Sequence, residues 1–254
     1  MNRLSKLDRS IAGRVAIVTG AASGMGRATA HLFADEGARV VAVDLNAEGI
    51  AAVGKEIEAA GGDVLALAVD VSDKAAVEEA VAQTIARYSS IDILVNNAGV
   101  FSPTLLEMDD YEERWDRTMA VNLGAQVTWV RACLPHLEKS DAGRIVNIAS
   151  TEGLGATTGA GPYTASKHGV VGLTRSLAME LGPRGITVNC ICPGPIHTGM
   201  TAAIDGTDKE IFAKRRTAIG RYGIPEEVAH GTLNYCLPAS RYMTGAVLPV
   251  DGGL

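Results

Sequence analysis

Arg14-Val-Ala-Ile-Val-Thr19, followed by Gly20-Ala-Ala-Ser-Gly24-Met-Gly26, is the stretch that decides the fold of this 254-residue chain. The first six residues form an apolar, β-branched run typical of a buried strand, and residues 25–36 have the length and pattern of a helix. The three glycines permit a tight turn and a close approach of the backbone to a phosphate, and the helix N-terminus offers free N–H groups. This order of strand, turn and helix predicts a nucleotide site, although the spacing differs from the commoner G-x-G-x-x-G.

The rest of the chain repeats this alternation of strand and helix. Nearly continuous apolar runs are typical of parallel strands that are covered on both faces. We therefore predict one α/β domain over residues 1–254, a Rossmann-type doubly wound parallel sheet of about seven strands with helices on both faces. The expected strands are residues 14–19, 38–43, 64–69, 91–95, 144–149, 186–191 and 246–250. The expected helices are residues 25–36, 47–60, 74–88, 111–137 with a bend near Pro135, 162–181 and 226–237. Residues 1–12 are expected to form a short polar lead-in, and the weakly periodic residues 195–224 a substrate-binding loop or lid.

Composition and charge narrow the classes of function. The formal net charge is -6 and no Lys/Arg cluster is present, so we expect no nucleic-acid partner. No apolar run approaches the ~20 residues that span a bilayer, and residues 1–10 lack the apolar core of a signal peptide, so we expect no membrane association and a cytoplasmic location. The four cysteines have neither zinc-ligand spacing nor the density of a disulfide scaffold, and we predict buried thiols at Cys133, Cys190, Cys192 and Cys236.

Polar residues follow the expected strands at one edge of the sheet. A carboxylate at Asp44, after the second strand, could accept hydrogen bonds from ribose hydroxyls and would repel a 2′-phosphate. Since no Arg or Lys lies within the glycine-rich turn or directly after Asp44, the pattern favours NAD over NADP; the alternative is a helix cap. Asp70 faces the adenine edge or caps the next helix together with Ser72 and Asp73. Asn96-Asn-Ala-Gly99 leaves room for a cofactor, or meets the needs of a turn.

Tyr163-Thr-Ala-Ser-Lys167 places a phenol and an ammonium on one face of a helix. A nearby cation favours the ionised phenol, so the pair could serve as a general acid/base for an alcohol or carbonyl. Alone, the spacing is more typical of a solvated lysine beside a tyrosine at the edge of the core. Ser150 ends the fifth strand on the same edge of the sheet.

Taken together in this order, the motifs resemble those of the short-chain dehydrogenase/reductase family, from about Gly13 to Gly253. The matching motifs are Thr19-Gly-x-x-x-Gly-x-Gly26, Asn96-Asn-Ala-Gly99, Asn122 within Met119-Ala-Val-Asn-Leu123, Ser150 after Ile145-Val-Asn-Ile-Ala149, Tyr163-x-x-x-Lys167, Pro193-Gly194 with Thr198, and residues 245–253.

The resemblance implies a role for each matching residue. Tyr163 would be the acid/base, Ser150 would orient the substrate oxygen, Lys167 would bind the nicotinamide ribose and lower the pKa of Tyr163, and Asn122 would hold a water. The implied cofactor contacts are Gly20, Ser23, Gly24, Met25, Gly26, Asp44, Leu45, Asp70, Val71, Asn97, Ala98, Gly99, Tyr163, Lys167, Pro193, Gly194, Ile196 and Thr198. His197 has no assigned role. The resemblance also implies a homotetramer built on the two long helices and the C-terminal strand.

The expected function is NAD-dependent hydride transfer between a secondary alcohol and its ketone. A 3-oxoacyl-carrier-protein reductase would more often use NADPH, and a non-catalytic NAD sensor could lose the residues at positions 150, 163 and 167; both stay open as alternatives. The mixture of apolar and charged residues over 195–224 suits a moderately apolar alcohol or ketone, a sugar-like polyol, or a cyclic substrate. Candidate pocket residues are Phe101, Thr151, Glu152, Leu154, Met200, Ile204, Asp205, Asp208, Lys209, Ile211, Phe212 and Arg215.

Overall fold

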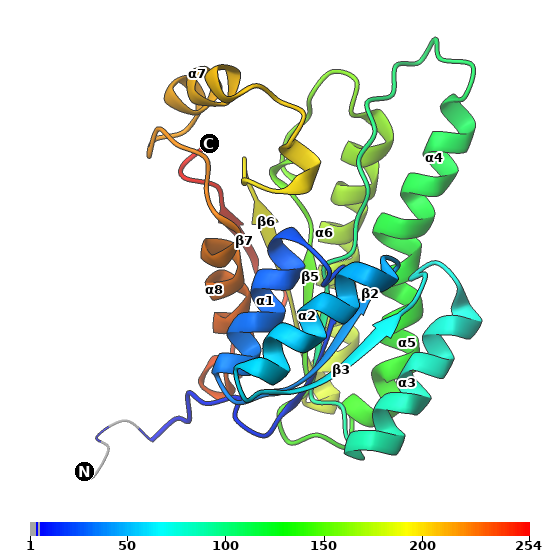
Figure 1. Cartoon of the computed structure of the whole chain (residues 1–254), viewed down its shortest axis with the longest axis vertical. Coiled ribbons are helices and arrows are strands. Elements are labelled where there is room, and N and C mark those ends of the chain that lie inside the picture. Colours follow the sequence, from blue (N-terminus) through cyan, green and yellow to red (C-terminus); the bar gives the residue numbers. More distant parts are fainter. Residues whose placement is uncertain (1–3, 5) are drawn as a thin grey trace.

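The computed structural model describes residue 4 and residues 6–254, and its centre is a parallel sheet (Figure 1). In the described residues the sheet has seven strands in the order β3-β2-β1-β4-β5-β6-β7, and every neighbouring pair is parallel. The strands are β1 (Val15–Thr19), β2 (Arg39–Asp44), β3 (Asp63–Ala68), β4 (Ile93–Asn96), β5 (Arg144–Ile148), β6 (Thr187–Pro193) and β7 (Val247–Val250). The strand order reverses between β1 and β4, which is where open α/β sheets bind ligands, at the carboxyl ends of the strands.

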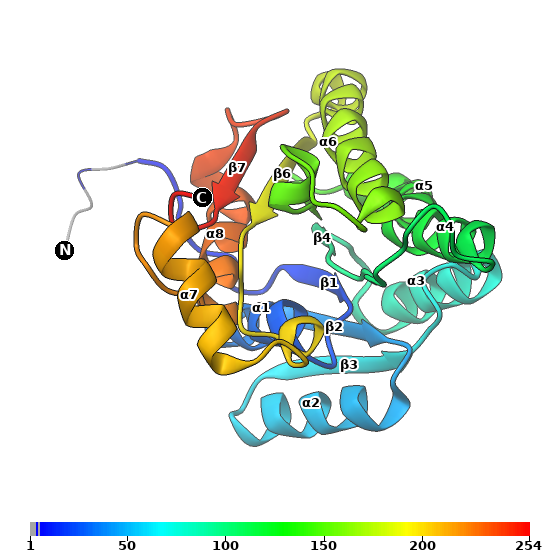
Figure 2. The ribbon, with the colours of Figure 1, turned by 90° about the horizontal axis from the view of Figure 1, so that it is seen from above.

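Helices cover both faces of the sheet (Figure 2). Along β1, Ala16 and Val18 face one core and Val15 and Ile17 the other, because successive side chains point to opposite faces. The first core packs under α1 (Gly24–Asp35), α2 (Ala47–Ala59) and α8 (Pro225–Cys236). The second packs under α3 (Lys74–Tyr88), α5 (Ala125–Leu137) and α6 (Gly161–Leu181), and α4 (Tyr111–Met119) precedes α5. The predicted doubly wound fold is confirmed.

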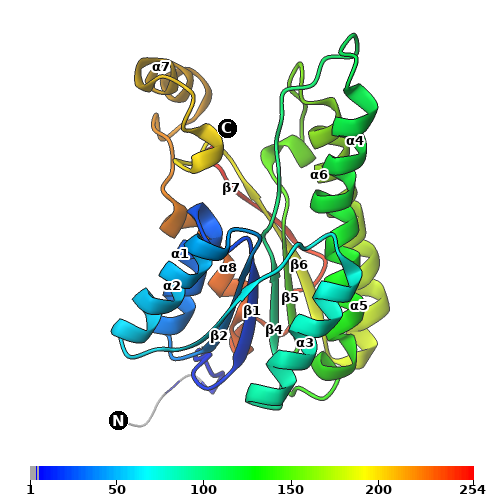
Figure 3. The same ribbon diagram turned by 45° about the vertical axis from the view of Figure 1, so that its right-hand side comes forward.

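Two details differ from the sequence prediction. Residues 195–224 include a helix, α7 (Gly206–Arg216), capped by the Asp205 carboxylate, which accepts the Thr207 N–H. The sequence pattern missed it because only Ala213 is buried, so no apolar stripe marks the helix. Figure 3 shows α7 apart from the sheet. The long helix expected over residues 111–137 continues through Pro135 and is interrupted instead by a π-helical turn, Ala120–Gly124.

The lead-in predicted at residues 1–12 lies partly outside the described residues. Residues 6–12 contain no helix or strand. They are not wholly a polar lead-in, because Ile11 is fully buried in the core under α1. The four cysteines are free and buried, as predicted. None of the helices in the described part of the chain has the length and apolar character that crossing a membrane requires.

Candidate functional site

The glycine-rich turn between β1 and α1 has the shape that a phosphate needs. Gly20 and Gly24 have φ values of +67° and +54°, which side chains other than glycine rarely adopt. A Cβ on Gly26 would overlap the carbonyl oxygen of Gly20, so only glycine fits there. Ser23 makes no side-chain capping hydrogen bond and the first turn of α1 has no acidic residue. The cradle and the positive end of the α1 dipole therefore fit the pyrophosphate of a dinucleotide.

Thr19 joins this turn to the turn after β4. Its Oγ1 accepts the N–H groups of Asn97 and Ala98, each at 3.0 Å. Asn97 returns the contact, since its Nδ2 donates to the carbonyls of Thr19 at 2.8 Å and Gly20 at 3.2 Å. The two turns at the point of strand reversal thus hold each other in place. The sequence analysis assigned Thr19 no role, although a hydroxyl between a buried strand and a glycine turn was a usable signal.

Asp44 lies half-buried at the end of β2 and supports the same turn. Its Oδ2 accepts the Ala22 N–H at 3.0 Å and its Oδ1 accepts the Asn46 N–H at 2.9 Å. The cap of α2 is Asn46, whose side chain accepts the Gly49 N–H, so Asp44 is not the helix cap of the alternative interpretation. Each carboxylate oxygen keeps a further lone pair that could accept a ribose hydroxyl.

Asp70, like Asp44, does not cap the helix that follows it. Its carboxylate accepts the N–H and the hydroxyl of Ser72, and these bonds lower the pKa of Asp70, with Arg117 lowering it further. The residue that caps α3 is Asp73. Arg117, on α4, lines the same cavity as Asp70. Nothing in the sequence motifs pointed to Arg117, because α4 meets this edge of the sheet only in the folded chain.

Two adjoining cavities collect most of the predicted site residues. One has a volume of about 500 Å³ and is lined, among the predicted residues, by Gly20, Ser23, Gly24, Met25, Asp44, Asn97, Ala98, Gly99, Tyr163, Lys167 and Thr198. The other, of about 430 Å³, adds Leu45, Asp70 and Val71. The predicted catalytic and cofactor-contact residues that line neither cavity are Gly26, Asn122, Ser150, Pro193, Gly194 and Ile196. Of the candidate substrate-pocket residues, Phe101 and Met200 line the first cavity.

Three of these six residues lie where the segment 195–224 leaves the sheet. Pro193 is the buried last residue of β6. A Cβ on Gly194 would lie 2.7 Å from Asp251 atoms, and Ile196 is buried and bridges to Gly223. Thr198, two residues after Ile196, does line the cavity. It lies close to the glycine-rich turn, because a Cβ added to Gly24 would be 3.3 Å from the Thr198 methyl group.

Tyr163 and Lys167, the predicted acid/base pair, lie together in the lining of the 500 Å³ cavity. Tyr163 is half-buried, and the Phe101 ring meets its ring edge-on at 5.2 Å between centroids. Lys167 is 3% exposed; its Nζ donates to the Ile148 carbonyl at 2.9 Å and lies 5.5 Å from the centre of the Tyr163 ring. The Ser150 side chain lowers the pKa of the Tyr163 phenol, so a serine thirteen positions upstream in the sequence acts on this tyrosine in the fold.

The pKa of Tyr163 differs from the sequence expectation. Burial raises it above its ordinary value, the Ser150 hydrogen bond opposes the rise, and the charge of Glu152 adds to it. Burial also lowers the pKa of Lys167 to about 8. The residues of the chain alone thus do not depress the pKa of Tyr163 as predicted, because desolvation of the phenol outweighs its other interactions.

Asn122 is fully buried in the π-helical turn. Its Oδ1 accepts the Val100 N–H at 2.8 Å, and its Nδ2 donates to the Val100 carbonyl and to Ser166 Oγ. A Cβ on Gly99 would lie 3.4 Å from Asn122 Oδ1 and 3.5 Å from Lys167 Nζ, so Gly99 leaves open the space between them. The predicted role of Asn122 in holding a water stays a prediction.

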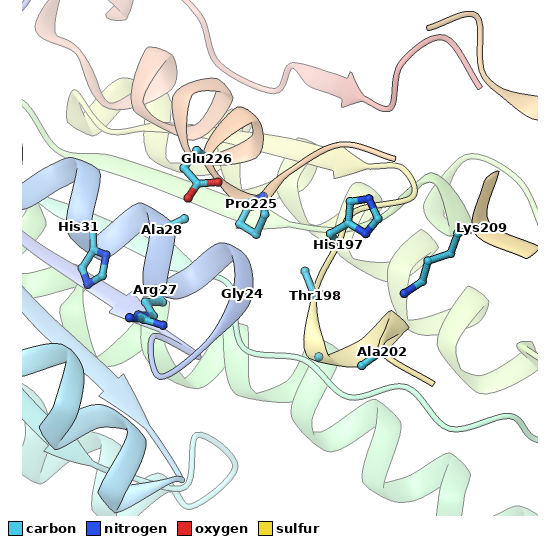
Figure 4. A pocket seen from close by; sticks show the side chains of 11 residues that line it. Gly24, Arg27, Ala28, His31, His197, Thr198, Ala202, Lys209, Pro225 and Glu226 are labelled. Carbon is cyan, nitrogen blue, oxygen red and sulfur yellow. The ribbon is translucent and has the colours of Figure 1, made fainter. Parts of the chain in front are cut away.

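A third cavity, of about 750 Å³, is lined by residues of α1, of the segment 197–209 and of the start of α8, and Figure 4 shows its side chains. Arg27 follows the glycine-rich turn directly, but its guanidinium makes two hydrogen bonds to Glu56, at 3.1 and 2.7 Å, and so is already paired. Lys209, on α7, makes no ion pair with any residue that the structure describes. The ring of the exposed His197 packs on Tyr222, with centroids 5.1 Å apart.

Comparison with known proteins agrees with this geometry. A family model described as enoyl-(acyl carrier protein) reductase matches residues 20–254. The chain is 44% identical to the (2S)-[(R)-hydroxy(phenyl)methyl]succinyl-CoA dehydrogenase subunit BbsD of Thauera aromatica, over 96% of this chain and 97% of that protein. It is 41% identical to the 3-oxoacyl-[acyl-carrier-protein] reductase FabG of Thermotoga maritima, over 95% and 98%. It is 38% identical to the 2,5-dichloro-2,5-cyclohexadiene-1,4-diol dehydrogenase LinX of Sphingobium indicum, over 96% of both chains.

Proposed function

The chain belongs to the short-chain dehydrogenase/reductase family of oxidoreductases, and from this premise we propose that it transfers hydride between NAD(H) and a secondary alcohol or its ketone, with Tyr163 as acid/base. The observation that carries the proposal is that Tyr163 and Lys167 line the same cavity as the glycine-rich turn and Asp44. A phenol and a dinucleotide cradle in one cavity are the two parts that such a reaction needs.

The bound nicotinamide would accept or supply the hydride. In oxidation, Tyr163 takes the hydroxyl proton of the substrate, and in reduction it returns a proton to the developing alkoxide. Ser150, which lowers the pKa of Tyr163, donates its hydroxyl hydrogen to the same substrate oxygen. Lys167 supplies a positive charge 5.5 Å from the phenol ring, which favours the tyrosinate once the site is filled.

Asp44 supports the choice of NAD. A carboxylate at the end of β2 would repel a 2′-phosphate, and the nearby Arg27 is held by Glu56 rather than free to bind one. We expect Asp44→Ser to lose NAD affinity by about tenfold to hundredfold, since a charge-assisted hydrogen bond contributes about 1.5–3 kcal/mol, and to gain affinity for NADP. Fluorescence titration with both reduced dinucleotides measures this, and a wild-type chain that prefers NADPH would refute the choice of NAD.

The decisive experiment follows nicotinamide absorbance while the purified protein meets a panel of alcohols and ketones. We expect turnover with NAD or NADH, and we expect Tyr163→Phe to lose it by a factor of about 10² or more while binding NADH normally. Substantial turnover by that variant would refute the role of Tyr163. Binding without turnover of any compound would support the non-catalytic sensor instead.

A second candidate is a 3-oxoacyl thioester reductase, because two of the relatives above are named for acyl-carrier-protein or CoA thioesters. The same panel should therefore include a 3-oxoacyl thioester with NADPH and with NADH. A rate with the thioester that exceeds the rate with free ketones would favour this candidate.

We also propose a homotetramer, as the family resemblance predicts, with a cytoplasmic location. Exposed apolar side chains on α5, α6 and the edge strand β7 support the assembly: Val127, Met179 and Leu248 are 37%, 82% and 37% exposed. Light scattering tests it, and a monomer would refute it.

A further inference from the structure

Glu152 lies between the serine and the tyrosine of the site in the sequence, and its carboxylate accepts three hydrogen bonds from the chain. Its Oε2 accepts the Thr157 N–H at 3.0 Å and the Thr164 hydroxyl at 2.7 Å, and its Oε1 accepts the Thr157 hydroxyl at 2.5 Å. From the sequence alone, Glu152 is either a pocket residue that binds a polar or cationic substrate group or an exposed loop carboxylate. These contacts give it a different role, because three donors of the chain itself already occupy the carboxylate.

The contacts of Glu152 fasten a loop to the catalytic helix. Thr164 directly follows Tyr163 in the first turn of α6, whereas Thr157 is in the middle of the loop 151–160. The far end of this loop is joined to a second one, since the Thr104 N–H donates to the Gly159 carbonyl at 2.7 Å. The loop that carries Phe101, whose ring meets the Tyr163 ring, is therefore hydrogen-bonded to the loop that follows Ser150.

The backbone of Glu152 acts on the serine as well. Its N–H donates to Ser150 Oγ at 3.1 Å. One lone pair of that oxygen is thus used, which leaves the hydroxyl hydrogen to point toward another acceptor, either Tyr163 or a substrate oxygen. A single residue thus contacts both the Ser150 hydroxyl and the helix turn that holds the phenol.

We propose that Glu152 is a positioning residue, which ties the loop 151–160 to the first turn of α6 and so fixes the Ser150 hydroxyl relative to the Tyr163 phenol. The proposal rests on the proposed function, because the positions matter only if these groups carry the reaction. Misplacement of reacting groups by about 1 Å can cost about 10²-fold in rate.

The charge of Glu152 has a second effect that can be measured, on the pKa of Tyr163. The charged and titratable groups around Tyr163 are Glu152 from the loop, Lys167 from its own helix, and the thiols of Cys190 and Cys192 from β6, which face Lys167. Burial is the main cause of the raised pKa of Tyr163, and the Glu152 carboxylate raises it further. Removal of the charge should therefore lower the pKa of the phenol.

Three substitutions distinguish the effect of the Glu152 hydrogen bonds to Thr157 and Thr164, called the tie below, from the effect of the Glu152 charge. Glu152→Gln can keep every contact, because the amide oxygen can replace Oε2 and the amide nitrogen can donate to the Thr157 hydroxyl. Glu152→Ala removes the tie and the charge, and Thr164→Val removes one hydroxyl of the tie at nearly constant volume. Glu58→Gln, at an exposed position on α2, is the matched control.

We expect Glu152→Ala to lower kcat about tenfold to hundredfold, with KM and NADH affinity changed less than threefold, and Thr164→Val to act in the same direction more weakly. Glu152→Gln should keep most of kcat and shift the acidic limb of the pH profile of kcat/KM to lower pH. Unchanged kcat in Glu152→Ala, or a loss fully explained by a lower Tm, would overturn the proposal.

Two readouts need no turnover and distinguish this proposal from the proposed function. Hydrogen exchange of the loop 151–160 should accelerate in Glu152→Ala and not in Glu58→Gln. Ultraviolet titration of the phenol, taken as the difference from a Tyr163→Phe background, should give a lower pKa in Glu152→Gln. If the wild type turns over no substrate, the proposed function fails; if the loop and the phenol titration are unchanged in the variants, the role of Glu152 fails.

Discussion

Lys167→Met is expected to make the protein more stable and inactive at the same time. The Lys167 side chain is 3% exposed, and its one hydrogen bond in the described part of the chain goes to the Ile148 carbonyl. No carboxylate in that part forms an ion pair with it. Methionine has a similar length, fills irregular space well and carries no charge. The substitution therefore removes a buried, unpaired ammonium while it keeps most of the packing.

The size of the effect follows from the pKa of Lys167. Burial lowers this pKa from 10.5 to about 8, which at about 1.36 kcal/mol per unit corresponds to about 3 kcal/mol. Loss of the donor to the Ile148 carbonyl opposes this by about 1–2 kcal/mol. The net gain in the free energy of unfolding at pH 7 is then about 1–2 kcal/mol. For a chain of this length that raises Tm by about 2–8 °C.

The pH dependence has a definite sign. Below pH 8, Lys167 is protonated in both states, so the cost of its burial is fully present. Between pH 8 and 10.5 the native state releases its proton while the unfolded chain still binds one, so the wild type gains stability as pH rises. Above that range the cost is absent. The stability advantage of Lys167→Met should therefore shrink between pH 8 and 10.5.

Urea unfolding of the dinucleotide-free protein from pH 7 to 10 checks this, with the exposed Lys55→Met on α2 as control. The control should show no pH-dependent gap from the wild type. The reasoning is refuted if Lys167→Met is less stable than the wild type at pH 7, or if the gap stays constant with pH. Retained turnover would separately contradict the role of Lys167 in the reaction.

Two further predictions concern the dinucleotide cradle. Gly26→Ala should lose most NADH affinity in a fluorescence titration, because the new methyl group would overlap the Gly20 carbonyl, whereas Gly172→Ala, with nothing within 4 Å, should bind normally. Normal NADH binding by Gly26→Ala would show that the turn adjusts. Thr19→Val should lower the free energy of unfolding by about 2–3 kcal/mol and weaken NADH binding, since it leaves two backbone N–H groups after β4 without their acceptor; a loss under 0.5 kcal/mol in urea unfolding would contradict this.

The sequence by itself determined the sheet, its helices and the edge at which the site lies. Apolar runs of strand length alternate with longer amphipathic segments, and this periodicity is local, so element positions came out within a few residues. α7 escaped because a helix that buries one alanine carries no such pattern. Site positions were also predictable where strand ends and glycines carry them, as at Gly20, Gly24 and Asp44.

The tertiary structure decided what each site residue experiences. The raised pKa of Tyr163 and the lowered pKa of Lys167 arise from desolvation, which depends on segments that pack around them from elsewhere in the chain. In the same way, only the folded chain brings Arg27 within hydrogen-bond distance of Glu56 and Thr164 within hydrogen-bond distance of Glu152. Motif spacing predicts which residues lie at the same edge of the sheet or on the same face of a helix, because these positions follow from the local backbone pattern. It leaves open which charges are buried and which donors are already used, because those depend on contacts between distant segments.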